Sequence, residues 1–162
     1  MKNVFVFAAV LLLALTAAAQ HDPNHHTHAA GVDSRGDHAM GFDHTSTAHH
    51  FLLKPDGGII RVEVNDSTDD ASRSSIRMHL SHIAKSFAAG DFDIPMFIHD
   101  RVPPGVPVMK RKKAQIAYEF REIPTGGEVV ITTSDRKAIA AIHDFLKFQI
   151  EDHRTGDSTA VQ

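Results

Sequence analysis

The residues best suited to chemistry in this chain are histidines, and four of them lie close together near the N-terminus. The stretch QHDPNHHTHAAG, residues 20–31, contains His21, His25, His26 and His28. Imidazole is a common ligand of zinc, copper and nickel, so a flexible segment of this composition can wrap one ion. The chain has no cysteine, which favours Cu(II), Ni(II) or Zn(II) over thiolate-bound metals. Incidental binding by a His-rich tail is an equally weighted alternative.

Four histidines of the expected folded body are further candidate metal ligands: His49, His50, His99 and His143. Adjacent residues of a strand point to opposite faces, so His49 and His50 are not expected to share one ion. His143 falls within the apolar stripe of a predicted helix, where it could approach His50 or His99. The favoured alternative is a core histidine that pairs with a backbone carbonyl.

Evidence for an enzyme is weaker. Asp100 and Arg101 follow His99 and could provide an acid/base group with an anion clamp, although three residues on a loop define no reaction. His79 and His82 are one helical turn apart, and the helical geometry favours an ordinary surface pair. The chain has no G-x-S-x-G, H-E-x-x-H or P-loop string, so catalysis is not the favoured prediction.

The N-terminus has the pattern of a cleavable secretory signal over residues 1–19. Lys2 precedes an apolar run from Val4 to Leu15, and Ala17 and Ala19 form an A-x-A cleavage pattern. The apolar run is shorter than the roughly 20 residues needed to span a bilayer. We therefore expect cleavage after Ala19, no stable membrane anchor, and export to the periplasm or the medium.

Composition limits the architecture and the partners. A chain of 162 residues with 42% apolar residues can build one core. Removing Lys2 with the signal leaves 16 Lys and Arg against 20 Asp and Glu, a net charge of −4 with neutral histidine. Nucleic acid is therefore not an expected partner, because phosphate binding requires clustered positive charge.

Residues 20–47 show no sustained hydrophobic period and predict a His-rich, extended or disordered arm. Met40 and Phe42 are its large apolar residues and could anchor it to the body. A single α+β domain is expected over residues 48–157, followed by a tail over 158–162.

The expected domain consists of two ββα units, over residues 48–90 and 113–157. In each unit two alternating apolar segments flank a Pro/Gly turn, and an amphipathic helix follows. Gly57-Gly58 and Asp66 match Gly126-Gly127 and Asp135 at a constant offset of 69, which predicts an internal repeat. The predicted fold is one antiparallel sheet with two helices on one face.

A Pro-rich crossover over residues 91–112 joins the two units. Its four prolines predict that it contains no helix. Phe145 and Phe148 lie off the main apolar stripe of the last helix, which indicates a second packed surface. Either the crossover or another subunit could cover that surface, and homodimerisation is therefore possible.

Several uncommon strings resemble an uncharacterised family of small exported bacterial proteins. These strings are Arg35-Gly36, Met40-Gly41-Phe42, His49-His50-Phe51, VPPGVPVMKR at 102–111 and HRTGD at 153–157. Members sometimes carry the label aspartate carbamoyltransferase. Enzymes with that activity resemble two-domain proteins with a Ser-Thr-Arg-Thr loop and a His-Pro motif, and neither string occurs here. We reject that activity for this chain.

The residues together favour an exported binding protein whose ligand is a divalent transition metal, Cu, Ni or Zn, with no organic cofactor. An interaction or structural module with incidental histidines is the alternative. A small hydrolase or lyase using the 99–101 loop is third.

Overall fold

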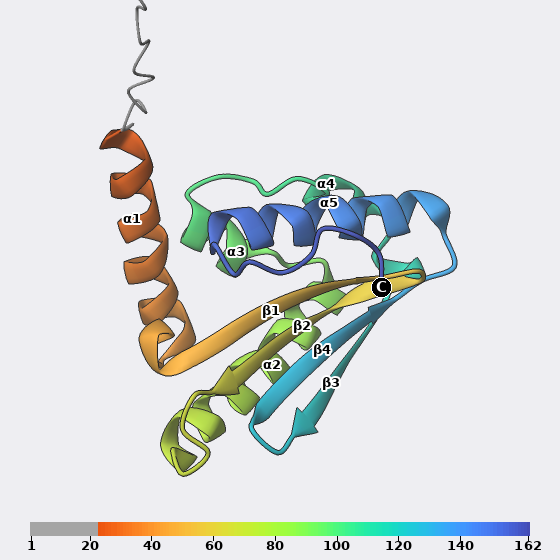
Figure 1. Ribbon diagram of the computed structural model, residues 1–162. Helices are drawn as coiled ribbons and strands as arrows, with labels where there is room; N and C mark the ends of the chain where they lie inside the picture. The colour runs from red at the N-terminus through yellow and green to blue at the C-terminus, as the bar shows by residue number, and fades with distance from the viewer. Residues whose placement is uncertain (1–22) are drawn as a thin grey trace, which may run out of the picture.

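An antiparallel sheet of four strands forms the centre of the computed structural model, which describes residues 23–162 (Figure 1). The first hairpin consists of β1 (Thr47–Lys54) and β2 (Gly57–Val64), and the second of β3 (Ala117–Ile123) and β4 (Gly126–Thr132). The strand order β1-β2-β4-β3 places the two hairpins side by side. The predicted signal, residues 1–19, lies outside the described residues.

A long helix follows each hairpin: α2 (Asp70–Ala89) and α5 (Arg136–Asp152). Aspartates cap both N-termini, since Asp69 accepts from the Ser72 N–H and Asp135 from the N–H groups of Lys137 and Ala138. Such caps satisfy backbone donors that the first helical turn leaves free. The two ββα units are therefore present as predicted.

Both long helices pack on the same face of the sheet. Alternate residues of all four strands face this layer, including Phe51, Val62 and Ile131, and all three are buried. Gly58 and Gly127 lie on the same face, and their missing side chains make room for Leu146 of α5 and for the ring of Phe120 on β3. The predicted fold class is confirmed: one antiparallel sheet with two helices on one face.

The opposite face of the sheet carries a mixture of apolar and charged side chains. Leu52, Ile59 and Val130 form a half-buried row across β1, β2 and β4. In the neighbouring row, Arg61 Nη2 lies 2.8 Å from Glu128 Oε2.

The two units correspond in register as well as in sequence. Ile60 of β2 pairs directly with Val129 of β4, and these positions are separated by the same offset of 69 that relates the glycine pairs. At equivalent positions, a Cβ on Gly57 would overlap the carbonyl oxygen of Ile131, and one on Gly126 would overlap that of Val62. Duplication of an ancestral unit stays a prediction.

Helix α1 (Pro23–Met40) occupies most of the segment that the sequence predicts to be an extended or disordered arm (Figure 1). Its helical state depends on contacts with the body, which a search for local periodicity does not detect. Val32 is completely buried, and Arg35 Nε donates a 2.7 Å hydrogen bond to the Ile98 carbonyl. Phe42 is buried and Met40 packs against the core, so the expected anchoring by these two residues is confirmed.

The crossover contains two short helices, α3 (Asp93–His99) and α4 (Val106–Arg111), so the prediction that its prolines exclude a helix is wrong. Pro95 is the third residue of α3 and Pro107 is the second of α4. The N–H groups of the first helical turn have no partner within the helix, so proline is tolerated there.

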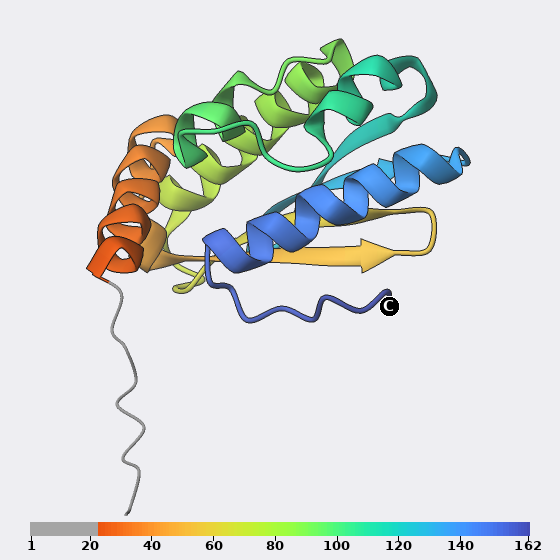
Figure 2. The ribbon, with the colours of Figure 1, turned by 90° about the horizontal axis from the view of Figure 1, so that it is seen from above.

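The C-terminal residues run back beside β1 (Figure 2). Asp157 Oδ2 accepts from the Phe51 N–H, and the Gln162 N–H donates to the Leu53 carbonyl. These contacts cover part of an edge that would otherwise expose backbone groups. Within residues 23–162, no helix combines the length and the apolar character needed to cross a membrane.

We expect Gly126→Ala to lower the free energy of unfolding by about 3 kcal/mol, because its Cβ would overlap the backbone of β2. Gly36→Ala is the control. A Cβ there lies 3.4 Å from Met40 Cε, and alanine favours a helix by about 1 kcal/mol over glycine. Urea unfolding measures both. Equal stability of the Gly126→Ala variant and the parent would contradict the close approach of β2 and β4.

Candidate functional site

Four histidines from different elements line one cavity of about 60 Å³ between the sheet and the helices. They are His49 of β1, His79 of α2, His99 of α3 and His153, which follows α5. Most other lining residues are apolar, and none of the lining residues is acidic. We call this space the inner cavity.

A second cavity of about 230 Å³, which we call the outer cavity, lies between α1 and the body. Met40, His49 and His153 border both cavities. The outer cavity is more polar, because Asp33 and His50 also line it. The three shared residues therefore separate a polar cavity from an apolar one.

The closest contact in this boundary joins Met40 and His49. His49 Nε2 lies 3.3 Å from Met40 Sδ, so a ring N–H can donate weakly to the thioether. The His49 ring also stacks parallel to that of His153, with centroids 6.0 Å apart and an angle of 3° between the planes. Phe42 packs against both His49 and His79, at 6.1 and 5.9 Å between centroids.

The histidines around the inner cavity favour the neutral form. Burial, with a smaller contribution from neighbouring histidines, lowers the pKa of His49 and of His79 to about 4. Burial and the nearby His99 and His49 lower the pKa of His153 to about 3. A neutral imidazole offers a ring nitrogen lone pair, which is the form that binds metals.

Asp152 connects the inner cavity to the surrounding elements. Its carboxylate accepts from His99 Nδ1 at 2.5 Å, Arg101 Nη2 at 3.0 Å and His28 Nε2 at 3.1 Å. Burial opposes ionisation, but the hydrogen bonds from His99 and His28 lower the pKa of Asp152 below its usual value. One carboxylate thus holds α1, the crossover and α5 together.

His99 is 1% exposed and uses both ring nitrogens. Nδ1 donates to Asp152, and Nε2 lies 2.9 Å from Gln149 Oε1. Burial lowers the pKa of His99, while these two hydrogen bonds oppose that shift. A neutral His99 that donates through Nδ1 can only accept at Nε2, so this contact requires the Gln149 amide to present its NH2 group to the ring. That arrangement also gives a partner to the buried amide nitrogen, which otherwise has none.

Only two of the four body histidines predicted as metal ligands reach the inner cavity. His49 and His99 do, whereas His50 lies on the open face with Nδ1 2.9 Å from Asp157 Oδ1. His143 Nε2 lies 2.9 Å from the Lys54 carbonyl, which confirms the favoured alternative of backbone pairing. A cluster of His143 with His50 or His99 is therefore not formed.

The other two cavity histidines, His79 and His153, are not among the predicted ligands. The prediction that His79 and His82 form a surface pair holds for His82, which is exposed, but is wrong for His79. His153 lies three residues after Ile150 and so continues the apolar stripe of α5 by one further turn, a spacing that could have identified it.

Of the four N-terminal histidines, the structure describes the side chain of His28. His21 and the side chains of His25 and His26 lie outside the described residues. His28 is in α1 and is paired with Asp152, so it contributes to docking this helix.

The predicted loop residues serve the packing of the crossover. Asp100 ends α3 in the left-handed conformation, with φ of 51°. Arg101 lies 4.5 Å above the ring of Phe148 and pairs with Asp152. Phe145 and Phe148 are buried, and Phe148 also packs edge-on against His99. The crossover thus provides the second packed surface expected for these two phenylalanines.

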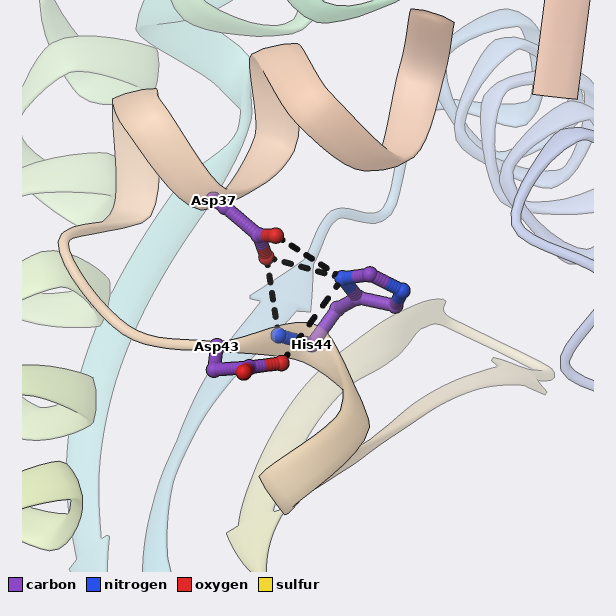
Figure 3. Close-up of side chains that lie close together, drawn as sticks. All are labelled: Asp37, Asp43 and His44. Atoms are coloured by element: carbon purple, nitrogen blue, oxygen red, sulfur yellow. Dashed lines mark hydrogen bonds and ion pairs between the residues drawn. The ribbon is translucent and has the colours of Figure 1, made fainter. Parts of the chain in front are cut away.

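Asp37, Asp43 and His44 form a group of three possible ligands outside the inner cavity (Figure 3). Among the described residues, it is the set of three His, Asp or Glu whose ligand atoms lie within 4.8 Å of one another. Its members already have partners: Asp37 accepts from His44 N and Nδ1, and Asp43 caps the turn at Thr45. These contacts explain the group as a connection between α1 and β1.

Comparisons with known protein families, curated proteins and solved structures find no match to this chain. The resemblance to exported bacterial proteins therefore stays an expectation.

Replacing Asp152 with Asn should lower the free energy of unfolding by about 1.5–3 kcal/mol, because the hydrogen bonds from His28, His99 and Arg101 lose their charged acceptor. Asp144→Asn, an exposed change on the same helix, should have little effect. Urea unfolding compares the two. Similar values for both variants would show that Asp152 does not have this connecting role.

The neutral cavity histidines predict a loss of stability in mild acid. Unfolded histidines titrate near pH 6.5, whereas the folded values for His49, His79 and His153 are about 4, 4 and 3. Below about pH 6.5 the unfolded chain binds more protons, so the free energy of unfolding falls as the pH decreases to about 4. Each histidine contributes at most about 1.4 kcal/mol per pH unit, and partial exposure reduces this.

Urea unfolding at about pH 7 and about pH 5 measures this dependence. Replacing His153 with Phe should reduce the slope, and replacing the exposed His82 with Ala should leave it unchanged. A His153→Phe slope equal to that of the parent would contradict a buried neutral imidazole at this position.

Proposed function

We propose that the protein is an exported binding protein for a transition metal ion, held by Met40 and the histidines of the inner cavity. The observation that carries this proposal is the contact of Met40 Sδ with His49 Nε2 at 3.3 Å. A soft thioether sulfur and a harder imidazole nitrogen meet there, at the boundary between the two cavities.

The distance between these two atoms suits a shared ion. With bonds of about 2.0 Å to nitrogen and about 2.3 Å to sulfur, atoms 3.3 Å apart subtend about 100° at the ion. This angle lies between the square-planar and tetrahedral values. Binding would replace the N–H···S contact without moving either side chain far.

Additional ligands are available around the same space. His79 and His153 border the inner cavity, and burial favours the neutral, metal-binding form of both. Their ring nitrogens do not belong to a preformed three-ligand group with His49 among the described residues. Recruiting either one would therefore require its ring to turn toward the ion. The cavity volume of about 60 Å³ leaves room for an ion and one water.

The N-terminal histidines have a different role in this proposal. Residues 20–28 carry four histidines, of which His28 is already paired with Asp152. They would provide weak ligands from which an ion passes to the body. Export after cleavage at residue 19 would place both sets of ligands outside the cytoplasm.

A second candidate function is protein interaction through the open sheet face. Leu52, Ile59 and Val130 form a half-buried apolar row there, bordered by the Arg61–Glu128 pair. Such a row could meet a partner protein or a second copy of the chain. Phe145 and Phe148 no longer support this alternative, because the crossover buries them.

The test is calorimetric titration of the purified protein with Cu(II), Ni(II) and Zn(II), followed by the same titrations on two variants. Replacing His49 with Leu should weaken the tight, one-to-one phase by roughly 100-fold or more, since loss of an outer partner alone costs about 10–100-fold. Replacing His21, His25 and His26 with Asn should preserve that phase.

His82→Leu is the matched control for His49→Leu, because it removes an exposed imidazole from the body. Tight binding that disappears only when the N-terminal histidines are replaced would reduce the protein to a flexible chelator. Absence of tight binding of these three ions and of Cu(I), titrated under anaerobic and reducing conditions, would also reject the proposal and favour the interaction module.

A further inference from the structure

The chemistry of the inner cavity indicates which ion it would hold. Its possible ligand atoms are imidazole nitrogens, the amide oxygen of Gln149 and one thioether sulfur. Thioether sulfur is a soft ligand that favours Cu(I), whereas carboxylates and water favour harder ions. Met40 is therefore the lining residue that distinguishes this site from an ordinary histidine site.

The charge of the lining residues also favours Cu(I). None of the residues that line the inner cavity is Asp or Glu, so no carboxylate ligand of this cavity would neutralise the charge of an ion there. The cost of moving an ion from water into a medium of low dielectric constant rises with the square of its charge. A monovalent ion is consequently much less costly to bury among neutral ligands than a divalent ion.

The acidic ligands lie elsewhere. Asp37, Asp43 and His44 form the compact group between α1 and β1, with His44 Nδ1 2.9 Å from one Asp37 oxygen and 3.9 Å from an Asp43 oxygen. Two carboxylates and an imidazole suit a divalent ion better than a monovalent one. The chain thus keeps its carboxylate ligands apart from the thioether.

The position of Met40 depends on the docking of α1. Met40 is the last residue of this helix, and the helix is held by the buried Val32 and by the 2.7 Å hydrogen bond from Arg35 to Ile98. Arg154 adds an ion pair to Asp33 at 2.8 Å. A thioether at the end of a docked helix is better positioned than one on a loose arm.

We propose that the inner cavity is a site for monovalent copper, Cu(I), and that Met40 determines this selectivity. This inference rests on the proposed function, because it names the ion that the same residues would bind. No electron transfer is involved: the ion enters as Cu(I) and is released as Cu(I).

Competition with the Cu(I) chelator bicinchoninate, under anaerobic and reducing conditions, measures the affinity. Replacing Met40 with Leu should weaken Cu(I) binding by roughly 100-fold or more while changing Zn(II) binding by less than about threefold. Leu and Met have similar volumes, so packing of α1 should persist, and circular dichroism checks this. Met78→Leu removes an exposed methionine, which is 72% exposed, and is the matched control.

A spectroscopic measurement tests the contact itself. The chain has 5 methionines, so labelling their methyl groups with carbon-13 gives a simple spectrum. Adding Ag(I), a redox-inert substitute for Cu(I), should shift the Met40 methyl signal and leave that of Met78 in place. Assignment follows from the two Leu variants.

The outcomes separate this inference from the proposed function. Unchanged Cu(I) affinity in the Met40→Leu variant, or an unmoved Met40 signal, would overturn the role of Met40. Weak Cu(I) binding beside tight divalent binding that requires His49 would overturn the choice of ion and leave the metal-binding proposal intact. No tight binding of any of these ions would reject both.

Discussion

The arrangement of the histidine-lined end of the molecule depends on one carboxylate. Asp152 is 8% exposed in its side chain, and it accepts from donors on α1, on α3 and on the loop between α3 and α4. A buried carboxylate is tolerated only where such donors compensate for its lost hydration. The three donors therefore must converge on the end of α5, and that convergence brings His99, His153 and Met40 to a common region.

The rest of the site depends on the neutrality of its imidazoles. A charged histidine in an apolar cavity would have to give up its hydration without a nearby carboxylate, which burial makes unfavourable. Among the four cavity histidines, only His99 has a carboxylate within hydrogen-bonding distance. His49, His79 and His153 instead have aromatic or sulfur neighbours, so they remain neutral and keep a lone pair available.

The sequence predicted the sheet and the two long helices because each depends on local patterns. Alternation in β2, the aspartate caps and the apolar stripe of α5 can all be recognised within a short window. Helix α1 could not be recognised in this way, since its burial depends on single residues such as Val32. The two crossover helices were not predicted, because the number of prolines alone does not distinguish a proline in the first helical turn from one in the helix interior.

The site likewise could be predicted only where it depends on local geometry and not on contacts between distant elements. Opposite orientations for His49 and His50 follow from strand geometry, and the structure confirms them. Convergence of His49 with His79 and His153 depends on how α2 and α5 cross the sheet. No local sequence pattern predicts how these helices cross the sheet, so the helical pattern alone predicts a surface position for His79.

Comparison of the two ββα units gives a reason to regard the imidazoles as more than packing. His49 of β1 corresponds to Tyr118 of β3 at the offset of 69. The helix caps Asp69 and Asp135 lie 66 residues apart, and aligning the helices on these caps relates His153 to Phe87. Tyr118 and Phe87 pack together with centroids 5.8 Å apart, and His49 and His153 do so at 6.0 Å.

The fold therefore accepts an ordinary aromatic pair at these equivalent positions. A pair of phenylalanines would fill the space beside β1 without burying a polar atom, whereas the Tyr118 hydroxyl of the other unit is buried without a hydrogen-bond partner. The unit that contains β1 instead carries two imidazoles there, next to the thioether of Met40. Packing alone does not require this difference between the units, and the proposed coordination of a soft metal ion would account for it.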